Sequence, residues 1–269
     1  MPMTQGKDQK SENNKKRGYF DRWWIMVAAV VALILLLIFS QPDPYKRIFL
    51  FVRQGIWTTV YITCVSFLLV MFFGLIVALA RLSKAAVIRG ISTVYVEVIR
   101  GIPMLVQLIF WYFAFPSVMQ SMGELLNVQS MIDYRANAVA MAILGLTVGY
   151  SAYMSEVYRA GIQSISRGQM EAARSLGMNY FQAMRYVILP QAVRVILPPV
   201  GNEFITLLKD SSLVSVVAVA DMTRRGREFM AANFIPIQTW VMIALLYLVM
   251  TLLAARLVTY LERKYKMEK

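Results

Sequence analysis

Apolar residues in this chain are gathered into long, nearly continuous runs separated by short polar segments. Six of these runs are close to the length of about 20 residues that crosses a bilayer as a helix. The pattern therefore predicts an all-α integral membrane protein with about six transmembrane helices. The predicted spans cover about residues 23–39, 55–80, 94–118, 136–153, 195–220 and 237–258.

The polar ends of the chain set the limits of this membrane domain. Residues 1–22 are rich in lysine, which predicts a disordered cytoplasmic basic tail, and residues 261–269 form a second basic cytoplasmic tail. No small-residue cleavage site follows the first run, so residues 23–40 are interpreted as an uncleaved, extra N-terminal transmembrane helix. Residues 50–260 then form the main transmembrane domain.

Basic residues between the runs predict the orientation of the chain. Cytoplasmic loops carry an excess of lysine and arginine, and with six spans most basic positions here fall on the side of the N-terminal tail. Both termini are therefore predicted to be cytoplasmic. The basic positions are Arg81, Lys84, Arg89, Arg159, Arg167, Arg174, Arg185, Arg263, Lys264 and Lys266. Only Arg224, Arg225 and Arg227 fall on the other side, where they are interpreted as a docking surface for an external partner.

Composition supports the membrane assignment and excludes several kinds of chemistry. The chain of 269 residues is 58% hydrophobic and 16% charged, which is too apolar for a soluble domain of this length. Its net charge of +13 comes from residues beside the apolar runs and at the termini, so no nucleic-acid surface is expected. The absence of histidine removes Ser-His catalysis and the common zinc sites, and neither catalytic nor metal-binding residues are predicted. The single cysteine, Cys64, is interpreted as a small buried apolar residue.

Residues 166–190, between the fourth and fifth runs, predict a cytoplasmic helix-turn-helix. Ser166 precedes Gln169 by three positions, the spacing of a capping box at a helix start, and Gly177 suits the left-handed backbone of a helix end. Asn179 is expected to cap a second helix, which Pro190 would close. The first helix carries an apolar stripe of Met170, Ala173 and Leu176. Such a stripe is too apolar for water, so the segment either binds a partner or rests on the membrane surface.

The same segment resembles the permease signature of ATP-binding-cassette importers. That signature reads EAA, three residues, Gly, nine residues and I-x-L-P, and Val187 stands here where isoleucine is usual. The signature positions are Glu171, Ala172, Ala173, Gly177, Leu189 and Pro190. The polar amino-acid branch of this family is also resembled by VEVIRGIPMLVQ from Val96, SEVYRAGIQSI from Ser155 and LPPVGNEFITLLKDSSLVS from Leu197. The resemblance covers about residues 50–260.

The resemblance implies a permease subunit of an importer in the bacterial cytoplasmic (inner) membrane. Its core would have five helices, to which residues 23–40 add one. Residues 171–177 would form a coupling helix that docks on separate ATPase subunits, which bind the ATP; the chain itself lacks a phosphate-binding loop and would be neither an enzyme nor bound to a cofactor. The implied partners are two ATPase subunits, a second permease subunit that is the same or a sister chain, an external solute-binding protein, membrane lipid and a polar amino acid.

Charged residues in the fifth run are the candidate substrate pathway. Glu203 and Asp210 are two helical turns apart with Thr206 between them, and Asn202 and Lys209 repeat this spacing one position round. Charges inside a membrane usually face a cavity or a protein interior. Two interpretations remain open: a carboxylate, Glu203 first, binds the ammonium group of an amino acid, or the charges form ion pairs between two permease subunits. Preceding these charges, the prolines and glycine at 198, 199 and 201 are expected to break or bend the helix.

Two further acid–base pairs have the spacing of neighbours on a helix. Glu97 precedes Arg100, and Glu156 precedes Arg159, by three residues. The predicted topology places both pairs near the cytoplasmic ends of spans, where they would form either an inner gate or a helix interface.

Two other functions fit parts of the pattern. A secondary amino-acid transporter driven by an ion gradient would explain a broken, charged fifth span, but it leaves the cytoplasmic segment 166–190 without a role. An intramembrane enzyme would use Glu203 and Asp210 as acid and base, but it would have to act without histidine or a metal cluster.

Overall fold

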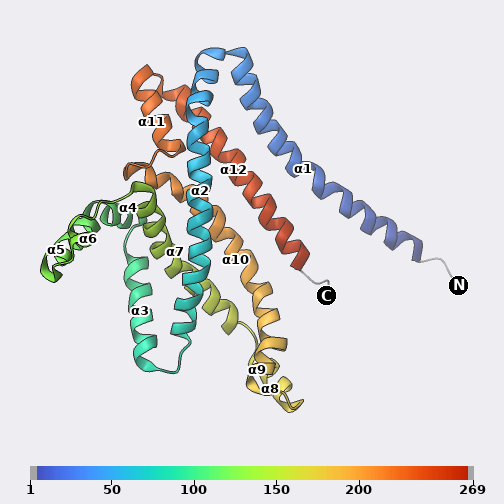
Figure 1. Cartoon of the computed structure of the whole chain (residues 1–269). Helices are drawn as coiled ribbons and strands as arrows, with labels where there is room; N and C mark the ends of the chain where they lie inside the picture. The colour runs from blue at the N-terminus through green and yellow to red at the C-terminus, as the bar shows by residue number, and fades with distance from the viewer. Residues whose placement is uncertain (1–4, 266–269) are drawn as a thin grey trace.

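The computed structural model describes the backbone of residues 5–265 and the side chains of residues 23–264. The described backbone contains helices and turns without a β-strand, which confirms the predicted all-α class. Helix α1 (Gln5–Ser40) and helix α2 (Pro42–Arg81) form a long antiparallel hairpin (Figure 1). Prolines 42 and 44 lie in the first turn of α2, where a missing backbone N–H costs no helical hydrogen bond. For this reason α2 begins before residue 55, the predicted start of the second span.

The remaining elements follow in a compact order. The first half of the chain continues with α3 (Ala86–Gly101), α4 (Met104–Ile109), the π turn η1 (Phe110–Ala114), α5 (Phe115–Leu126), α6 (Gln129–Ile132) and α7 (Ala138–Gln163). The second half contains α8 (Arg167–Ser175), α9 (Tyr180–Ala183), the π turn η2 (Met184–Ile188), α10 (Leu189–Asp210), the 3-10 helix η3 (Ser211–Val216), α11 (Met222–Asn233) and α12 (Pro236–Tyr265).

Helices α2 and α7 form the centre of the molecule, packed along much of their length. Small residues let the two backbones approach: a Cβ on Gly74 would come within 2.8 Å of the Met154 Cβ. Around this contact, apolar side chains such as Ile62, Leu146 and Leu207 are fully buried. A second apolar cluster joins α1, α2, α11 and α12. The α2–α7 pair therefore holds α3 and α10 in place on either side.

The elements are distributed between two ends of the molecule. Helices α8 and α9 lie at one end, and α11 lies with the α1–α2 turn at the other (Figure 1). Helix α1 rises toward that turn and α12 descends from α11, so their free ends both point away from the α11 end. Helices α4 to α6 project to one side.

Five helical segments of the described residues are long and apolar enough to cross a membrane, compared with six predicted spans. They are Trp23–Ser40, Pro42–Arg81, Met104–Leu126, Ala138–Gln163 and Pro236–Lys264. Helix α10 is not among them because it carries charges and prolines along its length. The predicted fifth span, 195–220, was also too long at its end, since α10 stops at Asp210 and η3 follows.

The predicted third span, 94–118, is wrong in its boundaries. Helix α3 begins at Ala86 and ends at Gly101, and a new helix starts at Met104 after Pro103. Pro103 cannot donate a backbone hydrogen bond, and it restrains Ile102 to extended backbone, which ends α3. The apolar run thus belongs to two helices that change direction between them.

The predicted N-terminal boundaries fare differently from one another. Residues 23–40 form the last part of α1, as expected for an extra helix. Residues 5–22, for which we predicted a disordered tail, extend that helix by continuous i to i−4 hydrogen bonding. Residues 1–4 of that tail and residues 266–269 of the C-terminal tail lie outside the described residues.

Candidate functional site

The predicted helix-turn-helix is present, and its turn has the expected chemistry. Helix α8 ends with the Gly177 N–H donating to the Arg174 carbonyl at 3.0 Å and the Met178 N–H donating to the Ala173 carbonyl at 3.2 Å. This is a Schellman ending, which requires the left-handed backbone that Gly177 adopts at φ +83°. No atom lies within 4 Å of the position that a Cβ on Gly177 would take. The glycine is thus required by the backbone, and the space around it is open for a partner.

The caps of the two helices differ from the prediction. Helix α8 starts after Ser166 as expected, but Ser166 makes no side-chain cap, because the Gln169 side chain instead accepts a hydrogen bond from the Gln191 amide at 3.1 Å. Asn179 caps α9 as predicted, and it forms a reciprocal capping box with Gln182 in which both hydrogen bonds measure 2.9 Å. The amides at 169 and 191 tie α8 to the base of α10.

Pro190 does not close the second helix, contrary to the prediction. Helix α9 continues through the π turn η2 into α10, and Pro190 lies in the first turn of α10. A π turn moves the hydrogen-bonding pattern by one residue and accommodates the missing N–H, and the Gln191 side chain donates to the Val187 carbonyl at 2.9 Å. The consequence is mechanical, because the segment after Gly177 is one continuous rod running into the membrane-spanning body.

The tip of this segment is an exposed apolar surface. Ala173 is buried between the two short helices, whereas Leu176, which we predicted on the same apolar stripe, is 81% exposed because the chain turns away from the helix axis there. Tyr180 and Phe181 are also mostly exposed. The signature residues Glu171, Ala172, Gly177, Leu189 and Pro190 are all exposed as well. We name this surface, made by residues 171–181, the coupling tip.

Helix α10 runs through Pro198 and Pro199 without a break, contrary to the prediction, and its polar residues divide between two faces. Asn202, Thr206 and Lys209 are exposed on one face. Glu203 and Asp210 are partly buried on the face toward α7, where the Tyr150 hydroxyl donates to the Asp210 carboxylate at 2.7 Å. Among the described residues, none of the three charged side chains of this stripe forms an ion pair.

The polar pocket on this face includes a cation that the spacing argument had paired elsewhere. Arg100, at the end of α3, is the positive charge that acts on Glu203, and its guanidinium lies 5.3 Å from the ring centre of Tyr153. Asp210 acts on Glu203 as a second negative charge. The residues that meet here come from three helices: Arg100 from α3, Tyr150 and Tyr153 from α7, and Glu203 and Asp210 from α10. We name these five residues the polar pocket.

Glu156 is the centre of a second charge cluster, which joins the ends of three helices. The Arg81 guanidinium of α2 lies 2.5 Å from one Glu156 oxygen, and the Arg159 guanidinium lies 2.7 Å from the other. Arg100 approaches the same carboxylate at 3.6 Å. The predicted Glu156–Arg159 pair is therefore present, but it belongs to a larger cluster of one acid and three arginines.

The predicted Glu97–Arg100 pair is absent. Because α3 begins eight residues before the predicted span, Glu97 and Arg100 lie in its last turns, and they point to different sides. Arg100 turns toward Glu156 and Tyr153, while Glu97 is exposed and makes no ion pair within the described side chains. Arg100 thus connects the Glu156 cluster to the polar pocket.

The break between α3 and α4 is held in shape by two side chains. The Gln107 amide donates to the carbonyls of Ile99 and Ile102, both at 2.8 Å. The Tyr95 hydroxyl donates to the Val148 carbonyl of α7 at 2.6 Å. These bonds satisfy carbonyls that the end of α3 leaves open, and they fix Arg100 beside the pocket.

The arginines of α11 form internal contacts, which differs from our interpretation of them as a free docking surface. Arg224 and Arg225 both pair with Glu228, at 2.9 and 3.5 Å, and Arg227 donates to the Ser215 hydroxyl at 3.0 Å. Asp221 caps α11 by accepting from two backbone N–H groups. Burial raises the pKa of the Asp221 carboxyl, and these N–H groups oppose that shift by stabilising the carboxylate.

Several residues of the site escaped the reasoning from sequence. Tyr150, Tyr153, Arg81 and Gln107 lie in apolar helices, and a single polar residue in such a helix is more often at an interface than in a site. Tyrosines three residues apart in the middle of a span were the available signal. Cys64, predicted to be buried, is exposed instead, because it faces a groove between helices.

A long α2–α7 core, a broken third helix, a charged α10 and an exposed coupling tip together define the transmembrane subunit of an importer with the type I fold. The sequence matches the family described as binding-protein-dependent transport system inner membrane component over residues 70–267. It is 34% identical to the glutamine transport system permease protein GlnP of Escherichia coli strain K12, over 79% of this chain and 92% of GlnP. It is 36% identical to the L-cystine transport system permease protein TcyB of Bacillus subtilis strain 168, over 78% of this chain and 87% of TcyB.

A solved structure agrees with both relatives. The fold matches a crystal structure of an amino acid ABC transporter with histidines at a TM-score of 0.72, with 37% identity, over 84% of this chain and 98% of that chain. The chain therefore belongs to the binding-protein-dependent transport system inner membrane components, the multi-pass permease subunits of ATP-binding-cassette importers. An ion-gradient carrier, the alternative weighed from the sequence, is not supported. The matched region begins within α2, so α1 lies outside it.

Proposed function

We propose that this permease carries a polar amino acid through the membrane along the polar pocket. The observation that carries the proposal is the meeting of Arg100, Glu203 and Asp210 on three helices that are otherwise largely apolar. An amino acid presents a carboxylate and an ammonium group close together, and a cation beside a carboxylate matches both. The substrates named for the relatives, glutamine and cystine, are of this kind.

Within the pocket, Glu203 binds the ammonium group and Arg100 binds the carboxylate. Arg100 suits this role because its side chain is 45% exposed and its contact with Glu156 is long at 3.6 Å, so the guanidinium has donors to spare. Asn202, Thr206 and Lys209, on the exposed face of α10, line the path beyond it or meet a second permease subunit. The ion-pair interpretation of this stripe stays open for Lys209, whose partner would lie on another chain.

The coupling tip docks on ATPase subunits that bind and hydrolyse ATP. Leu176, Tyr180 and Phe181 offer apolar contact area, and Glu171 offers a charge at the rim. The continuous rod from α9 to α10 carries motion of the tip directly to Glu203. The chain itself acts as a transport subunit without enzymatic activity and without a cofactor of its own.

Two ATPase subunits, a second permease of the same or a sister chain, and an external solute-binding protein complete the transporter. In this assembly the coupling tip and both termini are cytoplasmic, and α11 lies on the outer side. The basic residues around the coupling tip and near the end of α12 support this orientation by the positive-inside rule.

Co-purification and binding together test this function. The tagged chain, extracted in mild detergent from its own host, is expected to bring down an ATPase with a phosphate-binding loop. Radiolabelled amino acids should then bind to the purified complex, with binding reduced by Arg100→Gln or Glu203→Gln and retained in Lys84→Gln. Recovery of the chain without an ATPase would contradict the coupling role, and binding unchanged in both pocket variants would contradict the pocket.

A further inference from the structure

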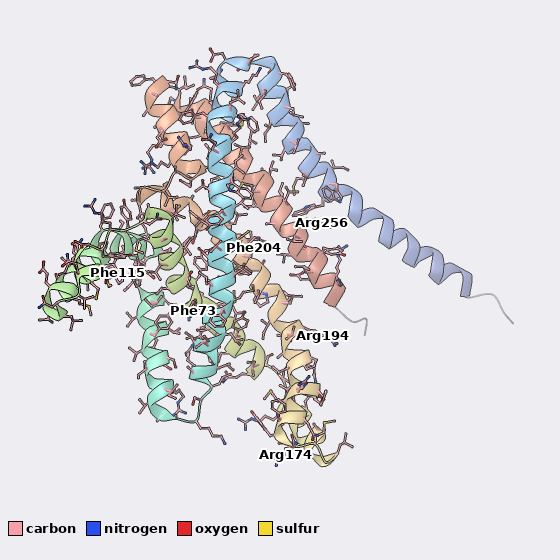
Figure 2. All side chains as sticks on the ribbon, in the orientation of Figure 1. Phe73, Phe115, Arg174, Arg194, Phe204 and Arg256 are labelled. Carbon is pink, nitrogen blue, oxygen red and sulfur yellow. The ribbon has the colours of Figure 1, made fainter. Side chains whose placement is uncertain are left out.

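A long apolar groove runs along the body at membrane depth, on the side where α2, α10 and α12 meet. It consists of two adjoining cavities of about 290 and 280 Å³. Phe204 and Leu257 line both cavities, so the two form one continuous feature. Figure 2 shows Phe204 between α2 and α12, where these two helices diverge.

The walls of the groove are almost entirely apolar. The first cavity is lined by Phe67, Met71, Leu197, Val200, Gly201, Phe204, Leu257, Val258 and Leu261. The second adds Val60, Thr63, Cys64, Leu208, Met250, Leu253 and Ala254. A groove with this lining does not stabilise water or a polar substrate, and it is separate from the polar pocket on the opposite face of α10.

The packing of α10 against α12 sets which residues stand opposite each other along the groove. The two helices are antiparallel (Figure 1), and a Cβ on Gly201 would overlap the Val258 side chain. Seven residues toward the coupling tip, about 10 Å along each helix, this register brings Arg194 opposite the last turn of α12, which contains Lys264.

Arg194 and Lys264 also continue the faces that line the groove. Arg194 lies three residues before Leu197 and seven before Gly201, and Lys264 lies three residues after Leu261, so each shares a helix face with lining residues. Both side chains are exposed, and neither has an ion-pair partner among the described side chains. Figure 2 shows Arg194 below Phe204, on the side of the coupling tip. The groove therefore ends in two free cations.

We infer that this groove binds an anionic glycerophospholipid of the cytoplasmic leaflet, with an acyl chain along α10 and the phosphate between Arg194 and Lys264. An acyl chain matches the lining and the elongated form of the two joined cavities. A phosphate at the leaflet surface matches the two cations in position and in charge. The site would act as a lipid contact of the permease, independent of the amino acid that it carries.

Photolabelling of the assembled transporter tests this site. The permease with its co-purified ATPase is placed in phosphatidylcholine nanodiscs with a small amount of phosphatidylglycerol that carries a diazirine in one acyl chain. Crosslinks are expected on groove-lining segments of α2, α10 and α12, and unlabelled phosphatidylglycerol should displace them better than phosphatidylcholine. Each of Arg194→Gln and Lys264→Gln should weaken labelling about fivefold, the effect of one basic residue near an anionic surface.

Two controls separate a site from general surface charge and from the apolar wall. The pair Lys84→Gln and Arg263→Gln removes the same charge on the same side but away from the groove, and it should leave labelling unchanged. Cys64→Trp fills the groove and should abolish labelling, whereas Leu68→Trp, on the exposed lipid side of α2, should not.

Three results would overturn the inference. Equal loss in both charge pairs would mean general attraction of anionic lipid, and labelling scattered over all helices would mean no bound chain. The third is a Cys64–Cys64 disulfide formed on mild oxidation, which would place a second copy of this chain over the groove in place of the lipid.

Discussion

Single residues in this permease have roles that depend on which neighbours the fold provides. Arg100 was expected to pair with Glu97 three residues earlier, yet it serves Glu156, Tyr153 and Glu203 instead. Asp210 was expected to act with Glu203 along one helix, yet its hydrogen bond comes from Tyr150 of another helix. A helical spacing of three or seven residues says that two side chains share a face, but only packing decides which third helix meets that face.

Replacing Glu203 by glutamine tests the charge in the polar pocket. The substitution keeps the shape of the side chain and removes the carboxylate that would bind the ammonium group, so transport is expected to fall at least about tenfold, the effect of losing one charge-assisted hydrogen bond. ATP-driven uptake of amino acid into proteoliposomes measures this. Co-purification of the ATPase should be unchanged, and loss of assembly with intact single subunits would indicate instead that Glu203 holds two permeases together.

Replacing Tyr150 by phenylalanine tests the contact between α7 and α10. Without the hydroxyl, the partly buried Asp210 loses its donor, and the free energy of unfolding is expected to fall by about 1.5–3 kcal/mol. Thermal unfolding of the purified chain in detergent measures the change. Tyr153→Phe is the matched control, because no hydrogen bond of its hydroxyl is observed and its ring stays beside Arg100; an equal loss in both variants would contradict this role of Tyr150.

Among the elements, the coupling tip was the most accurately predicted and α3 the least. Residues 166–190 carry strong local signals, because Gly177 and Asn179 each specify a backbone conformation by their own chemistry. The end of α3 depends on Pro103 within a long apolar run, and hydropathy alone does not distinguish one span from two helices meeting at an angle. Pro190 shows the reverse case, since a proline that locally predicts a helix end is absorbed by a π turn.

Replacing Gly177 by valine tests whether the turn transmits motion. Valine in a left-handed backbone costs about 1–2 kcal/mol or more and would displace α9 relative to α8. Uptake and stimulated ATP hydrolysis are both expected to be lost while the chain remains in the membrane. Gly168→Val is the matched control, because Gly168 lies in helical backbone with open space around it; equal loss of activity there, or normal transport in Gly177→Val, would refute the role of the turn.

At the scale of the whole molecule, the chain is a transport body without an energy source. Its pathway residues, its coupling tip and its external helix α11 lie at three levels along one axis (Figure 1). Such a layout needs a partner at each end, because the chain contains no phosphate-binding loop and the coupling tip leaves apolar side chains in water.

The energy source gives the prediction at this scale. Proteoliposomes that contain the permease, its co-purified ATPase and its solute-binding protein are expected to accumulate amino acid only when ATP and magnesium are present on the side of the coupling tip. A protonophore should leave this uptake unchanged. Uptake that persists without ATP and stops with the protonophore would show an ion gradient at work and contradict the proposed mechanism.

The sequence by itself determined the class of this protein and the location of its coupling segment. Continuous apolar runs require membrane helices, and the spacing from Glu171 to Pro190 is local chemistry that survives any arrangement of the rest. Tertiary structure decided the contents of the polar pocket, the Glu156 cluster and the lipid groove, because each is built from helices far apart in the chain. Their partners are set by the close approach of α2 to α7 and of α10 to α12, a geometry that depends on small residues packing across helices and that no single segment specifies.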